Sequence, residues 1–93
     1  MKTRKLLDLV SVGKATYDDF IMLNIHTVED LVGRDANQLF EELKQIRGLK
    51  TLDQCCEDVF KTAIMQAENR NLPDEQKQWW YWSKVRKGII EHC

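Results

Sequence analysis

Residues 52–67 read LDQCCEDVFKTAIMQA and carry the strongest helical periodicity in the 93-residue chain. Apolar side chains recur there at spacings of three and four, which places them on one stripe of a helix. The members of the stripe are Leu52, Cys55, Cys56, Val59, Phe60, Ala63, Ile64 and Ala67. We therefore expect this helix to form the centre of the core, with either Thr51 or Asp53 as its N-terminal cap.

Weaker helical signals precede this central helix. They cover residues 3–10, residues 15–23 and residues 36–46. Asp35 is a good cap for the last of these, because Gln38 follows at the third position. Thr27 with Asp30 has the same spacing and predicts a short additional helix.

After the central helix, the loop at residues 69–73 leads into a last helical segment. Pro73 suits the first position of a helix, and Asp74 favours its positive end. We expect this helix to fray after Gly88, with a disordered tail over residues 89–93. No stretch alternates with a period of two, so the sequence predicts an all-α fold of five or six short helices in one domain, residues 1–88.

Composition excludes several classes of protein. The apolar fraction of 43% and the charged fraction of 31% are ordinary for a soluble domain. No apolar run reaches the ~20 residues of a membrane helix, and the N-terminus does not resemble a secretory signal. The odd set Cys55, Cys56 and Cys93 is a poor disulfide framework, which favours a cytoplasmic location.

Few side chains suggest catalysis or metal binding. The histidines are His26, expected in a local hydrogen bond, and His92, which lies in the tail. No Cys-x-x-Cys pair is present, and the helical stripe predicts that Cys55 and Cys56 are buried as small apolar groups. We therefore expect no enzyme activity, no metal or other cofactor and no small-molecule substrate. A thiol or metal site at Cys55, Cys56 and His26 is the least favoured alternative.

Two short segments resemble a known DNA-binding module. Residues 9–15 read LVSVGKA and residues 23–31 read LNIHTVEDL, which resembles the helix-hairpin-helix family. Gly13 matches the second glycine of that hairpin, whereas Ser11 and Asn24 stand where glycine is usual. The residues CCEDVF at 55–60 and KQWWYW at 77–82 extend the similarity to small bacterial pathogenicity-locus proteins over about residues 5–87. The resemblance implies a compact bundle like those of SAM and helix-hairpin-helix domains.

The hairpin has a physical basis for binding phosphate. The first turn of a helix has unpaired N–H groups with partial positive charge, and a glycine before it lets an anion approach the backbone. We expect Ser11, Gly13, Lys14 and Ala15 to form this site, with Lys14 adding a full charge. Such contacts do not read bases, so the predicted function is weak, sequence-independent DNA binding. The alternative is a plain connection between helices.

A second glycine-containing break at residues 46–51 includes Arg47, Gly48 and Lys50. It could form a degenerate second hairpin, although its apolar phase does not match the first. A plain helix–helix connection is the favoured interpretation of this segment. The balance of 14 basic and 15 acidic residues also tells against a wide DNA-binding surface.

The aromatic run near the C-terminus supports a rival function. Consecutive helical positions point about 100° apart, so the rings at residues 79–82 cannot all face one core. At least one ring should therefore be exposed, either to a partner protein or above nearby cations. The candidate surface comprises Trp79, Trp80, Trp82, Lys84, Arg86 and Lys87. In this rival, the hairpin is only structural and the aromatic helix docks an unknown protein.

Overall fold

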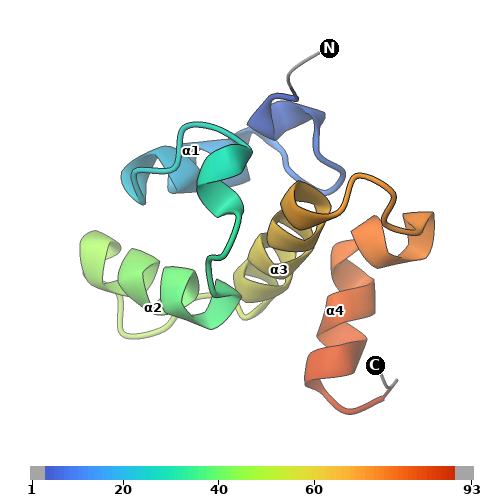
Figure 1. Ribbon diagram of the computed structural model, residues 1–93. Coiled ribbons are helices and arrows are strands. Elements are labelled where there is room, and N and C mark those ends of the chain that lie inside the picture. Colours follow the sequence, from blue (N-terminus) through green and yellow to red (C-terminus); the bar gives the residue numbers. More distant parts are fainter. Residues whose placement is uncertain (1–3, 90–93) are drawn as a thin grey trace.

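The computed structural model describes residues 4–89, so the expected tail, with His92 and Cys93, falls outside the described residues except for Ile89. The described range contains four α-helices, three 3-10 helices and no strand, which confirms an all-α fold (Figure 1). The elements are η1 (Leu6–Asp8), α1 (Lys14–Met22), η2 (Glu29–Leu31), α2 (Ala36–Arg47), α3 (Cys55–Glu68), η3 (Asp74–Lys77) and α4 (Trp79–Arg86). Within residues 4–89, no helix is both long and apolar enough to cross a bilayer.

Residues 4–89 contain four α-helices, below the five or six expected. The segments near residues 3–10 and after Thr27 form η1 and η2, which are single turns of three residues each. The first turn ends at Asp8 because the next residue, Leu9, has extended backbone with ψ of 141°, and Ser11 beyond it has a left-handed φ of 71°. The segment expected to form the first arm of a helix-hairpin-helix unit is therefore a 3-10 turn and not an α-helix.

The central helix is α3, which lies between α2 and α4 (Figure 1). Phe60, Ala63 and Ile64 of the predicted stripe are buried, and the Phe60 ring lies 5.3 Å from the ring of Phe20 in α1. Cys55 and Cys56 are only half-buried, which corrects the expectation of full burial. Both thiols lie in the first turn of α3, where the helix leaves the core.

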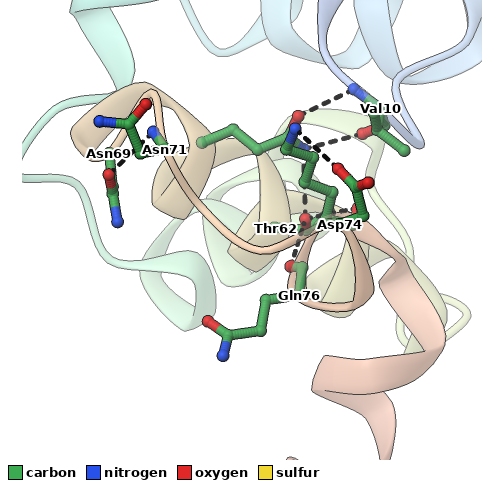
Figure 2. Close-up of polar contacts among 8 residues, drawn as sticks. Val10, Thr62, Asn69, Asn71, Asp74 and Gln76 are labelled. Carbon is green, nitrogen blue, oxygen red and sulfur yellow. Dashed lines mark hydrogen bonds and ion pairs between the residues drawn. The ribbon is translucent and has the colours of Figure 1, made fainter.

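The expected last helix is interrupted at Gln78, whose backbone is extended with ψ of 136°. The Thr62 hydroxyl on α3 lies 3.1 Å from the carbonyl oxygen of Gln76 and 2.7 Å from that of Lys77 (Figure 2). The Trp82 indole N–H also donates to the Gln76 oxygen at 2.6 Å and the Ser11 hydroxyl to the Lys77 oxygen at 3.2 Å, so both carbonyls have partners other than helical N–H groups. The segment therefore divides into η3 and α4.

The expected capping hydrogen bonds are present. The Asp35 carboxylate accepts a hydrogen bond from the N–H of Gln38 at 3.1 Å, and that of Asp53 accepts one from Cys55 at 3.0 Å. The N-cap residue of α3 is Gln54, which makes no side-chain cap bond, so Asp53 satisfies the first helical N–H from one position before the N-cap. Thr27 and Asp30 bond reciprocally at 3.1 and 3.2 Å.

Replacing Asp30 with asparagine is expected to lower the free energy of unfolding at neutral pH. Hydrogen bonds from the backbone N–H groups of His26 and Thr27 lower the pKa of Asp30 below its ordinary value of 3.8. Because the folded state favours the carboxylate, this contribution is fully present above pH 3.8 and is lost as the pH falls through the lower folded value. Urea unfolding of both proteins across this range tests the effect. A difference that does not shrink on acidification would contradict it.

Candidate functional site

The hairpin at residues 9–13 connects η1 to α1. Ser11 and Asn24, which replace two usual glycines, have φ of 71° and 65°, so both positions require the left-handed conformation that glycine adopts freely. Gly13 is different, because its φ of −100° is open to any residue. A Cβ atom there would meet nothing within 4 Å. The missing side chain of Gly13 thus leaves open space in front of α1.

The start of α1 has donors without helical acceptors. Gly13 is its N-cap and provides no side-chain acceptor, and the first turn has no acidic residue. The first intrahelical bond runs from the N–H of Tyr17 to the oxygen of Gly13, so the N–H groups of residues 14–16 have no acceptor within the helix. Lys14 and Ala15 are exposed beside them.

Lys14 is paired with an acid on its own helix. Its Nζ lies 3.2 Å from Asp18 Oδ2, and the two side chains are 84% and 53% exposed. Exposed pairs of this kind contribute little, so the pair does not hold Lys14 away from an anion. The sequence did not indicate that Asp18 lies against the cation of the candidate site.

A buried glutamine fixes the hairpin to the core. Gln66 on α3 is 4% exposed. Its Oε1 accepts a hydrogen bond from the N–H of Val10 at 2.9 Å, and its Nε2 donates to the oxygen of Val10 at 3.0 Å (Figure 2). The Gln66 amide also donates to the Thr62 hydroxyl at 3.2 Å. One side chain thus satisfies both polar groups of the Val10 backbone and holds the hairpin against α3.

The hairpin is also bonded to the start of α4. The Ser11 hydroxyl donates to the oxygen of Lys77 at 3.2 Å and accepts from the N–H of Trp79 at 3.2 Å. Figure 1 shows the hairpin loop beside the turn that precedes α4. The hairpin and the aromatic helix are therefore adjacent, although the sequence assigned them to two alternative functions.

The rings next to this junction are exposed. Trp79 is 39% exposed and Trp80 is 37% exposed, which confirms that the aromatic run does not all face the core. The Nζ of Lys84 lies 5.1 Å from the centroid of the Trp80 ring. We call Gly13, Lys14, Trp79 and Trp80 the hairpin–tryptophan surface.

Two other members of the predicted aromatic surface are engaged within the protein: Trp82 is buried, whereas Arg86 stays exposed but forms an ion pair with α3. Trp82 is 3% exposed, and its Nε1 donates to the oxygen of Gln76 at 2.6 Å. Arg86 turns toward α3, where its Nε and one terminal nitrogen bond to Asp58 at 2.9 and 3.0 Å. Lys84 and Lys87 remain exposed. The outward part of α4 is therefore smaller than the sequence suggested.

The second glycine-containing break does not resemble the first. Gly48 ends α2 with a φ of 65°, and α3 begins only at Cys55. Asp53 accepts the hydrogen bond of the Cys55 N–H, and Arg47 pairs with Asp19 at 3.5 Å. The start of α3 is thus already capped by a carboxylate. The geometry agrees with a plain connection, and Lys50 is exposed on it.

The half-buried thiols of α3 have an environment that disfavours the thiolate. Burial raises the pKa of both thiols, aided at Cys55 by the carboxylate of Asp53 and at Cys56 by that of Asp19. The His26 ring contacts Asn24 at 3.1 Å, in the expected local hydrogen bond. Across residues 4–89, no three Cys, His, Asp or Glu side chains are grouped to hold a metal ion.

Comparison with known proteins identifies relatives of the chain. Residues 1–88 match the protein family described as Pathogenicity locus. The chain is also 32% identical over 85 residues to a protein named mitomycin resistance protein McrB from Streptomyces lavendulae, with 91% of this chain and 76% of that protein aligned. No solved structure matches the chain.

Proposed function

The chain belongs to the pathogenicity locus family, and on the geometry of its hairpin we propose that it binds DNA without regard to sequence. The segment from η1 through α1 would act as a helix-hairpin-helix unit with a shortened first arm. The observation that supports this most is the start of α1, where free N–H groups, an exposed Lys14 and open space at Gly13 coincide. Together these groups suit one phosphate of the DNA backbone.

The charge of the protein sets the expected strength of binding. The net charge is −1, so few phosphates can be neutralised at one time. Binding that involves two or three phosphates gives a log–log salt slope of about −2 to −3 and a dissociation constant of ~10⁻⁴–10⁻⁶ M. This affinity is appropriate for a protein acting on DNA inside the cell, the location that its cysteine content favours.

Lys14→Glu is expected to weaken binding to every DNA sequence alike. Losing one contact between a charged group and a phosphate corresponds to about 1.5–3 kcal/mol, roughly tenfold or more in affinity. The salt slope should fall by about 1. Fluorescence anisotropy with labelled DNA at about 50 and about 200 mM salt measures both quantities. Circular dichroism and thermal unfolding verify that the variant is folded.

Two further variants separate a local effect from a general effect of charge. Lys50→Glu makes the same change in net charge on the connection between α2 and α3, and should leave binding nearly unchanged. Asp18→Asn removes the acid that pairs with Lys14 and should strengthen binding. Equal losses in Lys14→Glu and Lys50→Glu, or no binding by the wild type at low salt, would contradict the proposal.

Docking of a partner protein on the hairpin–tryptophan surface is the second candidate function. It is favoured by exposed apolar side chains on the two segments that meet there, because Val10, Trp79 and Trp80 are 38%, 39% and 37% exposed. In that case the hairpin serves only to position α4. The absence of DNA binding at low salt, with the folded state intact, would favour this function over the first.

A further inference from the structure

We propose that the Trp79 ring stacks on an unpaired nucleobase, so that the preferred ligand is single-stranded DNA. This inference rests on the proposed function, because the hairpin supplies the phosphate contact beside the stacked base. The juxtaposition that carries it is the hydrogen bond between the Trp79 N–H and the Ser11 hydroxyl. Ser11 lies only two residues before Gly13 in the chain.

The ring is attached to a rigid part of the molecule. Trp79 is the first residue of α4, and its backbone is fixed by Ser11 at 3.2 Å. Two residues of extended chain span at most roughly 7 Å, so Ser11 and the Gly13 backbone lie within about that distance. The backbone of Trp79 is therefore close to the start of α1, near enough for one strand to reach both the Trp79 ring and the phosphate site. Because both segments are already held in place, the protein loses little conformational entropy when both contacts form.

Stacking explains how a protein with so little positive charge could hold a polyanion. Each base stacked on an aromatic side chain raises affinity by roughly 5- to 150-fold, and every base has a suitable face. This contribution needs no excess of cations and no particular sequence. The base faces inside a duplex are covered by their neighbours, whereas those of a single strand are accessible to an exposed indole ring.

A cation lies on the neighbouring ring of the same helix, where Lys84 Nζ is 5.1 Å from the centroid of Trp80, and the start of α1 adds positive potential next to the hairpin. These charges favour a polyanionic partner over an apolar one. Trp80 points about 100° away from Trp79 around α4, so it cannot share the same stacked base. Trp79 is therefore the ring assigned to stacking.

The test compares two probes that have the same phosphates. One is an oligothymidylate of about 12 nucleotides, and the other is an abasic strand of equal length. Wild type is expected to bind the oligothymidylate roughly 5-fold or more tightly than the abasic strand. Trp79→Phe should retain most of this preference, because it keeps an aromatic ring. Trp79→Leu keeps an apolar side chain and should bind both strands with the affinity of the abasic one.

Tryptophan fluorescence gives a second readout that a structural role alone would not change. Quenching on binding oligothymidylate should be largest in the wild type and reduced in Trp79→Phe, which still binds. Ile46→Ala is a control for truncating an exposed apolar residue, because Ile46 is 52% exposed at the end of α2. It should leave the preference and the quenching intact.

The possible failures are distinguishable. If the wild type binds both strands equally and Lys14→Glu still weakens binding, the stacking inference is wrong while phosphate binding stands. If Trp79→Leu retains the preference, the ring is not the stacking group. If neither strand binds at low salt, the proposed function itself fails, and with it this inference.

Discussion

Trp82→Ala is expected to lower the free energy of unfolding by ~3–5 kcal/mol, the usual effect of truncating a buried tryptophan. The Trp82 ring is 3% exposed, lies edge-on to Tyr81 at 5.0 Å, and donates a hydrogen bond to the oxygen of Gln76. Truncation would leave a cavity between α3 and α4 and remove the donor to that carbonyl. A loss of this size is a large part of the stability of a small domain.

Trp80→Ala is the matched control for this prediction. Trp80 lies two positions earlier on the same helix and is 37% exposed, so its truncation removes less packing than that of Trp82. The loss of stability in Trp80→Ala should therefore be clearly smaller than in Trp82→Ala. Chemical denaturation followed by circular dichroism measures both variants. Equal losses of stability would show that Trp82 does not have the core role assigned to it.

The elements that the sequence predicted best depend on local interactions. The caps at Asp35 and Asp53 and the reciprocal pair of Thr27 and Asp30 involve residues two or three positions apart. Their geometry is set by the helix ends themselves. The periodicity of residues 52–67 likewise located the central helix to within a few residues of α3.

The contacts that organise the candidate site are long-range and could not be read from spacing. Gln66 bonds to Val10 across 56 residues, and Trp79 bonds to Ser11 across 68. A glutamine within a helical pattern normally indicates a solvent-facing position, because burying its amide is unfavourable without partners. Here the partners are supplied by a distant hairpin. The break at Gln78 was also not predicted, because the hydroxyls that bond to the preceding carbonyl belong to Thr62 and Ser11, which are distant in the sequence.

The location of Arg86 shows how tertiary pairing changes a surface predicted from one helix. Lys84, Arg86 and Lys87 look equivalent in the sequence, yet only Arg86 faces a carboxylate on α3. That carboxylate belongs to Asp58, which is 2% exposed on the core helix α3. An acid at such a position is unfavourable unless it is paired. The guanidinium of Arg86 therefore neutralises Asp58 and stabilises the contact between α3 and α4, so it is not available to the candidate interaction surface.

Arg86→Met is expected to lower the free energy of unfolding by about 3 kcal/mol, because it leaves the Asp58 charge buried without a partner. This is at the lower end of such losses, since an open cleft of about 280 Å³ borders the pair and admits water. The double variant Asp58→Leu and Arg86→Met should recover most of the loss, since replacing both charges by apolar groups is often neutral. Urea unfolding of the wild type, both single variants and the double variant gives the coupling energy. Additive losses of stability in the two single variants would mean that the ion pair does not stabilise the contact between α3 and α4. An Arg86→Met variant with unchanged stability but weaker DNA binding would instead show that Arg86 contacts DNA.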